Sequence, residues 1–251
     1  MTLVRTALSA ALLLISSLVA AASVAQGACR GGGYTYAGMN GDDPVAGVAA
    51  RITLLSTFDV LDGHVAAYVG VGGAGEGLNG TNEWIQVGLS AFDGIVPGHR
   101  LYYEIAHANG TITYHEVLKR VTVGEMHRVA VYELANHRNW WRVQVDGRPV
   151  TRPILLPGSH HRWRPLVTGE SWGSGAASCN AYAYRFERVR IARSPGGRWT
   201  PLASGTAFYD PGYSVARRTP ASFVASRSAR TEDLPRGHVR RFGLVGASDD
   251  G

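Results

Sequence analysis

A glutamine, Gln86, lies in the middle of the apolar run Glu83–Leu89, and this placement is the first hint of chemistry. A second apolar run, His64–Val71, precedes it, and the glycine-rich segment Gly72–Gly80 joins the two. Both runs are short and rich in β-branched and aromatic residues, so we predict two strands. A side-chain amide in such a strand is either structural or a hydrogen-bond donor in a site.

A glycine motif in the same stretch suggests a phosphate cradle. Gly70–Gly75 matches G-x-G-x-x-G and follows a predicted strand. A dinucleotide site also needs a helix to begin there, so that its N-terminal amides meet the pyrophosphate. The following residues, Glu76–Thr81, cannot sustain a helix, so we interpret the glycines as a loop between strands and predict no cofactor.

A serine motif later in the chain suggests a nucleophile. Gly169–Gly173 matches G-x-S-x-G around Ser171, and Asp210 and His238 follow in the order of an α/β-hydrolase triad. That nucleophile elbow requires a turn from strand to helix in a parallel sheet. The chain shows no alternation of strands and helices, but a serine hydrolase using Ser171 remains an alternative.

Metal and glycosidase sites have weaker support. The chain has 9 histidines, which are scattered, and His160-His161 is their adjacent pair. Neither H-E-x-x-H nor a Cys/His zinc spacing occurs, so we predict no metal site. Paired acids at alternate positions of one strand, as a β-glucanase would present, are not visible, because Glu83 and Gln86 are three residues apart and face opposite ways.

The elements that would position these residues are strands. Asn109-Gly110 and Asp146-Gly147 each separate two β-rich runs, which is the pattern of a tight hairpin. Ala181–Ile191 alternates, which predicts Tyr182, Tyr184, Phe186 and Arg188 on one side. Strands recurring every 8–12 residues, without helical periodicity, predict an all-β fold, an antiparallel β-sandwich of concanavalin-like, jelly-roll type. The further predicted strands are 45–57 (one or two strands), 101–105, 111–117, 121–123, 128–134, 140–145 and 148–155, with one or two more from 199–208 and 221–226.

The two ends of the 251-residue chain differ from its body. Residues 1–25 have a positive start, an apolar stretch and Ser23-Val24-Ala25, which predict a secretory signal peptide. A glycine-rich lead (26–33), the sandwich domain (34–226) and a loose polar tail (227–251) follow. No other apolar run is long enough to span a bilayer. We therefore expect a secreted protein, located outside the cell or in its envelope.

The two cysteines and the net charge restrict which disulfide and which partners the protein could have. Cys29 and Cys179 are the 2 cysteines, and an even pair in an exported protein usually forms a disulfide. Two unrelated thiols, or a lipid anchor on Cys29, are the alternatives. The net charge is +6, but the basic residues are spread along the chain and Lys119 is the only lysine. We therefore expect no specific nucleic-acid partner.

Three blocks resemble a known family, the glutamic peptidases (eqolisins). They are Tyr68–Gly73 (YVGVGG), Trp84–Gly88 (WIQVG) and Tyr102-Tyr103-Glu104. The segment Glu170-Ser171-Trp172 resembles the family's strand with the catalytic glutamate, and 222–224 could be its closing strand. The family's members are secreted, acid-acting endopeptidases on a concanavalin-like β-sandwich.

The resemblance implies roles for two residues. Gln86 would be the amide that orients the attacking water and donates to the oxyanion, and Glu170 would be the general acid/base. Both must then project from one face of a sheet, toward a polypeptide substrate. We also expect a monomer. The alternatives are a structural protein without a site and a non-catalytic module that binds a polysaccharide or other polymer on the exposed rings of Trp84, Trp140, Trp141, Trp163 and Trp172.

Overall fold

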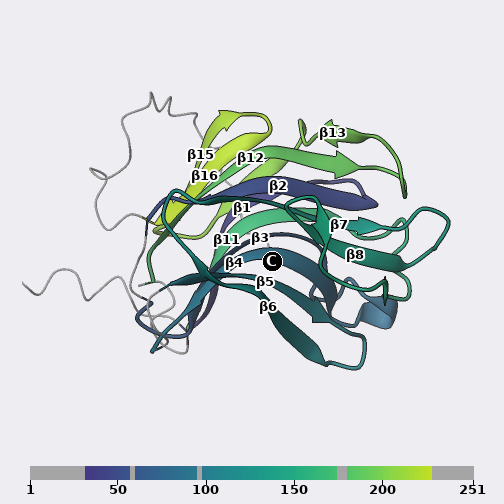
Figure 1. Ribbon diagram of the computed structural model, residues 1–251, viewed down its shortest axis with the longest axis horizontal. Helices are drawn as coiled ribbons and strands as arrows, with labels where there is room; N and C mark the ends of the chain where they lie inside the picture. Colours follow the sequence, from purple (N-terminus) through teal and green to yellow (C-terminus); the bar gives the residue numbers. More distant parts are fainter. Residues whose placement is uncertain (1–31, 57–59, 95–97, 174–179, 228–251) are drawn as a thin grey trace, which may run out of the picture.

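The computed structural model describes residues 32–56, 60–94, 98–173 and 180–227. These residues form two antiparallel sheets packed face to face (Figure 1). The all-β sandwich expected from the strand pattern is therefore confirmed. The signal peptide, Cys29, Cys179, His238 and the tail after Arg227 lie outside the described residues, and the cleavage site and disulfide stay predictions.

The first sheet carries the residues of the three sequence blocks. Its order is β14-β1-β11-β3-β4-β5-β6, and we call it the first sheet throughout. Its strands are β1 (Gly33–Asn40), β3 (His64–Gly73), β4 (Glu83–Phe92), β5 (His99–Ala106), β6 (Ile112–Val121), β11 (Pro165–Gly173) and β14 (Thr206–Tyr209).

The second sheet covers the other side of the core. Its main order is β10-β8-β7-β2-β12-β16-β15, with β13 paired to β12 and β9 paired to β8. Its strands are β2 (Gly47–Leu54), β7 (Met126–Glu133), β8 (Trp140–Val145), β9 (Arg148–Pro149), β10 (Ile154–Leu155), β12 (Tyr182–Ala192), β13 (Trp199–Pro201), β15 (Ser214–Thr219) and β16 (Ser222–Arg227).

One hydrophobic core fills the space between the sheets. Alternate residues of each strand face it, because successive side chains of a strand point to opposite faces. In β4 the core positions are Ile85, Val87 and Leu89, each with no exposed surface. In β2 they are Val48 and Ile52, also fully buried. Gln86 has the opposite parity, so it lies on the solvent face of the first sheet.

Both predicted hairpins form. Asn109-Gly110 lies in the turn between β5 and β6, and Asp146-Gly147 lies between β8 and β9. Asp146 and Gly147 have φ values of 49° and 85°, the left-handed pair that a two-residue hairpin turn requires. The glycine segment 74–82 joins β3 to β4 through one 3₁₀ turn, Leu78–Gly80, as expected for a loop between strands.

Several predicted strands have different bounds. Predicted strand 148–155 divides into β9 and β10, and 199–208 divides into β13 and β14, which belong to different sheets. Residues 122–125 form a turn, not part of a strand, and β15 has no counterpart in the prediction. The short strands carry too few alternating residues to be recognised from periodicity.

The alternation predicted for β12 fails at one residue. Tyr182, Tyr184 and Phe186 face the core as expected, but Arg188 has a φ of 51° and the register with β2 shifts between Glu187 and Arg190. This irregularity places one extra residue in β12, so Val189 becomes the next core residue and Arg188 is exposed. The prediction that Arg188 lies on the same side as these three aromatic residues was wrong. Within the described ranges, no helix is long and apolar enough to cross a membrane.

Candidate active site on the first sheet

The solvent face of the first sheet places Gln86 beside an acid. Gln86 of β4 lies opposite Gly70 of β3 on one side and Glu104 of β5 on the other. Its Nε2 donates to Glu104 Oε1 (3.3 Å) and to the Tyr102 hydroxyl (3.2 Å). The Trp84 indole nitrogen donates to the same Glu104 oxygen at 2.8 Å. Gln86 and Trp84 therefore both hold Glu104, and the amide has a fixed orientation.

Glu170 lies on the same face and has its own partners. It belongs to β11, and the residue is 7% exposed. Oε2 accepts a hydrogen bond from the Tyr68 hydroxyl (2.9 Å), and Oε1 lies 3.0 Å from His64 Nε2. Both partners come from β3, the neighbouring strand. The carboxylate is thus buried with a hydrogen-bond partner on each oxygen, as a nearly buried acid requires.

Gln86 and Glu170 share the face but not a row of the sheet. Glu170 pairs with Ala66, and Ala66 pairs with Ser90, which is four residues along β4 from Gln86. The backbones of Gln86 and Glu170 are therefore separated by four residues, or about 13 Å, along the strands and by two strand spacings, or about 10 Å, across the sheet. The residue of β11 in the row of Gln86 is Leu166.

Two tyrosines occupy the row between them. Tyr68 of β3 and Tyr102 of β5 both pair with Gly88 of β4, one from each side, and they share a small buried cluster with Ala66. Tyr68 reaches toward Glu170 and Tyr102 toward Gln86 through the hydrogen bonds above. The two polar groups are thus the two ends of one cluster.

The carboxyls of Glu104 and Glu170 interact electrostatically. Burial raises the pKa of Glu104, and the negative charge of Glu170 raises it further. The Trp84 hydrogen bond and His64 act in the opposite direction without cancelling the rise. Burial and Glu170 likewise raise the pKa of Tyr68 and Tyr102, so both phenols stay neutral and can donate hydrogen bonds. Such shifts are common where acids perform chemistry.

Aromatic rings border the Glu170 end of the face. The His64 ring stacks on Trp172, with centroids 5.8 Å apart, and Tyr34 stacks on Tyr36 at the same separation. Tyr34 is 55% exposed, and Trp172 is partly exposed. These rings give an extended ligand flat surfaces beside the acids.

Sequence reasoning identified Gln86 and Glu170 but missed Glu104, His64, Tyr68 and Tyr102 as members of the site. Three of the four lie within the blocks that carry the family resemblance or directly before one. The available signal was parity: Trp84 and Gln86 in β4, and Tyr102 and Glu104 in β5, alternate onto one face. The pairing of β3 with β11, which brings His64 and Tyr68 to Glu170, cannot be read from either strand alone.

Ser171 is not placed as a nucleophile. It has no exposed surface and lies inside β11, with the opposite parity to Glu170. The motif is therefore in a strand and not at a strand-to-helix turn. Asp210 accepts a hydrogen bond from the backbone nitrogen of Tyr36 (2.6 Å), an interaction that ties β1 to the loop after β14. These positions argue against a Ser171 hydrolase.

Two of the tryptophans considered as binding surfaces are in the core. Trp141 and Trp163 have no exposed surface and stack on each other, with centroids 5.9 Å apart. Trp84 and Trp172 are partly exposed on the solvent face of the first sheet, and Trp140 is 36% exposed on the second. In the described part of the chain, no group of three or more histidine, cysteine or acidic side chains gathers as a metal site would require.

The fold and the face together define a class: a β-sandwich with a cluster of carboxylates, an amide and phenols on one sheet. Solved structures with a similar β-sandwich fold exist. The scytalido-glutamic peptidase bound to a peptide-based transition-state analogue has a TM-score of 0.56 and 11% identity, covering 79% of this chain and 100% of that one. SCP-B, an eqolisin in complex with the tripeptide Ala-Ile-His, has a TM-score of 0.50 and 11% identity over 78% of this chain and 98% of that one.

These likenesses show an eqolisin-like fold. No protein-family model and no curated protein matches the sequence. The family resemblance in three short blocks therefore has a counterpart in the whole fold, but not in overall sequence. The chemistry of the face must be argued from its own residues.

Proposed function

We propose that the protein is a secreted, acid-acting endopeptidase in which Gln86 and Glu170 form the catalytic pair. The observation that carries this proposal is the solvent face of the first sheet, where the amide and the acid belong to one cluster with two neutral phenols. The eqolisin-like fold supports it further, because the sandwich presents this face to solvent.

The proposed reaction starts at Glu170. Its ionised carboxylate removes a proton from a water, whose oxygen attacks the carbonyl carbon of the scissile peptide bond. The carbonyl oxygen gains negative charge, and the Gln86 amide stabilises it when one of its N–H groups turns from Glu104 or Tyr102 to the substrate. Glu170 then gives its proton to the leaving nitrogen as the C–N bond breaks.

Glu104 acts on this pair as a positioning residue. Its hydrogen bond fixes the Gln86 amide, and its raised pKa keeps the carboxyl neutral into milder acid than an ordinary glutamate. A neutral Glu104 does not repel the charge that develops on the substrate. Activity on the acid side of neutrality follows from that condition.

The distance between the rows of Gln86 and Glu170 requires a substrate that lies across both. An extended polypeptide can do this, since its carbonyl groups recur along the chain and the aromatic rings of Tyr34 and Trp172 lie at one end of the face. Such a substrate would bridge the tyrosine row, and the Gln86 amide and the Glu170 carboxyl would both have to reach one of its carbonyl groups for the reaction to proceed.

The experiment is cleavage of an unfolded protein from pH 3 to pH 7 by the secreted protein and its variants. Glu170→Gln and Gln86→Ala should each lower the cleavage rate by about 10²–10³. Ser171→Ala should cleave nearly as wild type if it folds, since its hydroxyl faces the core. The melting temperature of each variant, compared with wild type, separates lost chemistry from lost folding.

The alternative is a module that binds a polypeptide or polysaccharide without cleaving it. Leu166 in the row of Gln86 favours it, because an apolar residue lies where an acid would be level with the amide. Binding of substrate to wild type without cleavage at any pH would establish that alternative and overturn the peptidase. Cleavage abolished by Ser171→Ala in a folded variant would likewise contradict the Gln86–Glu170 pair.

A further inference from the structure

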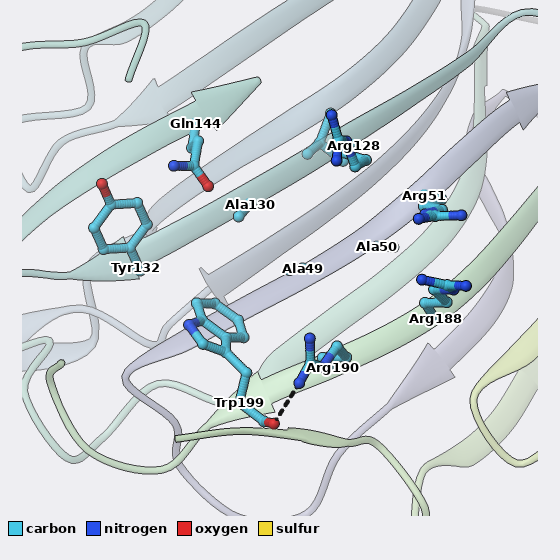
Figure 2. Close-up of a pocket in the computed structure, with 11 residues that line it drawn as sticks. Ala49, Ala50, Arg51, Arg128, Ala130, Tyr132, Gln144, Arg188, Arg190 and Trp199 are labelled. Carbon is cyan, nitrogen blue, oxygen red and sulfur yellow. Dashed lines mark hydrogen bonds between the residues drawn. The ribbon is translucent and has the colours of Figure 1, made fainter. Parts of the chain in front are cut away.

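A hollow on the outer face of the second sheet is lined by arginines. Its volume is about 460 Å³, and it lies on the opposite sheet from Gln86 and Glu170. Figure 2 shows the arginines on one side of the hollow and Tyr132, Gln144 and Trp199 on the other. We call it the arginine groove; its four arginines are Arg51, Arg128, Arg188 and Arg190.

Small residues of the central strands form the floor of the arginine groove. Ala49 of β2 pairs with Ala130 of β7, and both line the hollow. Two residues along β2 from Ala49, and so on the same face, Gly47 lies beneath Trp199, where an added Cβ would be 2.8 Å from the indole. Because the side chains at these three positions are small, the arginines and Trp199 surround an open space.

The strand pairing sets the arginines side by side. Arg51 and Arg128 are direct cross-strand neighbours, although like charges opposite each other destabilise a sheet. Arg188 faces outward only because of the irregularity in β12. Arg190 donates from Nη2 to the backbone oxygen of Trp199 at 2.7 Å, which holds the Arg190 side chain at the rim.

None of these four guanidinium groups forms an ion pair with a described acid. Among the residues that the structure describes, the arginine ion pairs are those of Arg100 with Glu116 and Arg193 with Asp43, both elsewhere. The acids nearest in the strand pairing are Glu187, opposite Arg51, and Asp146, whose carboxylate accepts from the Arg128 backbone nitrogen and lies 2.8 Å from His127. The arginine groove therefore keeps a net positive charge.

We propose that the arginine groove binds an acidic polysaccharide, with its carboxylate groups on the arginines and a sugar ring against Trp199. The planar guanidinium donates two parallel hydrogen bonds to a carboxylate, which suits Arg51 and Arg128 side by side. Tyr132 and Gln144 supply a hydroxyl and an amide at the rim for sugar hydroxyls. The site is independent of the proposed peptidase, because it uses no residue of the first sheet.

The composition of the arginine groove favours a polysaccharide over a single-stranded nucleic acid. A protein that follows single-stranded nucleic acid combines positive charge with several aromatic rings on which successive bases stack. Here one indole and one phenol lie together at one end, and the arginine side has no ring among its lining residues. The five strands that contribute these residues, β8, β7, β2, β12 and β13, span about 19 Å, enough for more than one sugar ring.

The test is isothermal titration of the folded protein with oligogalacturonate. The matched ligand is its methyl ester, which keeps the sugar backbone and removes the negative charges. Binding of the free acid, weakened by salt, with at least tenfold weaker binding of the ester is the expected result. Equal binding of the two ligands, or binding of neither, would overturn the proposal. Tighter binding of single-stranded DNA than of oligogalacturonate would overturn the choice of polymer.

Variants locate the binding. The double variant Arg51→Gln, Arg128→Gln should weaken binding of the free acid at least about tenfold, since it removes the charged hydrogen bonds from the two guanidinium groups to the carboxylates of the ligand. Trp199→Ala should weaken it several-fold. Arg120→Gln, an exposed arginine on β6 of the first sheet, is the matched control and should bind as wild type. An equal effect of Arg120→Gln and the double variant would contradict the assigned site. Glu170→Gln should bind oligogalacturonate as wild type does. The binding test therefore stays informative even if the proposed peptidase activity is not found.

Discussion

Glu104 has an environment unlike that of an ordinary surface acid. It is partly buried, accepts from Trp84 and Gln86, and has a pKa raised by burial and by Glu170. A raised folded-state pKa means that the folded protein binds the proton more tightly than the unfolded chain. Its stability contribution is therefore complete below the ordinary value of 4.5 and is lost as pH rises.

Replacing Glu104 by glutamine should stabilise the protein at neutral pH. Glu104→Gln keeps an acceptor for Trp84 and removes the buried charge, so its gain over wild type should grow above pH 4.5 and vanish in stronger acid. Urea unfolding at pH 4 and pH 7 measures this difference. Glu116→Gln, which breaks the ion pair with Arg100 (3.1 Å), is the control and should give no gain. A Glu104→Gln variant that is less stable at pH 7 would contradict this account.

At the scale of elements, Gly88 sets how closely β3 and β4 approach under the two tyrosines. A Cβ at this position would collide with the backbone oxygen of Ala67, which cannot move away as a flexible side chain could. Gly88 lies in the row of Tyr68 and Tyr102, so any shift there also moves the hydroxyls that hold Glu170 and Gln86.

We predict that Gly88→Ala destabilises the protein by about 1–3 kcal/mol, the usual range for overpacking, and lowers peptidase activity. The matched variant is Gly73→Ala at the end of β3, where an added Cβ would meet only Glu76 Cγ, at 3.7 Å. It should change stability by less than about 0.5 kcal/mol. Chemical denaturation of both variants measures the contrast, and equal effects would show that the close approach at Gly88 is not limiting.

The elements also show how far sequence reasoning reached. The long strands and both hairpins follow from period-two alternation and from turn chemistry that acts between neighbours in sequence. The irregularity at Arg188 does not, because it depends on how β12 pairs with β2 and not on β12 alone. The same holds for the site: the parity of Gln86 is local, whereas the contact of Glu170 with His64 and Tyr68 depends on the pairing of β11 with β3.

At the scale of the molecule, one buried hydrogen bond joins the two sheets. His99 Nε2 of β5 lies 2.8 Å from the Tyr184 hydroxyl of β12, and burial lowers the pKa of His99 to about 4. The unfolded chain then binds the proton first as pH falls below its ordinary value of 6.5. The stability due to neutral His99 is therefore full above pH 6.5 and is lost progressively toward pH 4.

This linkage predicts an acid-sensitive fold, with a loss of about 3 kcal/mol between pH 6.5 and pH 4 from His99. His99→Gln keeps a hydrogen-bonding group near Tyr184 but does not titrate, so its stability should fall less steeply over that range. Thermal melts across the range compare the two proteins. Parallel pH profiles would exclude His99 as the cause. If the predicted loss of stability is observed, unfolding in acid limits the activity of the protein at low pH, in addition to the protonation of the site.

The central claim, that Gln86 and Glu170 act as one catalytic unit, is tested most directly by a double-mutant cycle on kcat/KM. Wild type, Gln86→Ala, Glu170→Gln and the double variant would be assayed on one peptide substrate at the optimal pH. Residues that act on the same transition state are strongly non-additive, so we predict that the double variant loses little more than the worse single variant. Additive losses, or single variants that cleave as wild type, would contradict the claim.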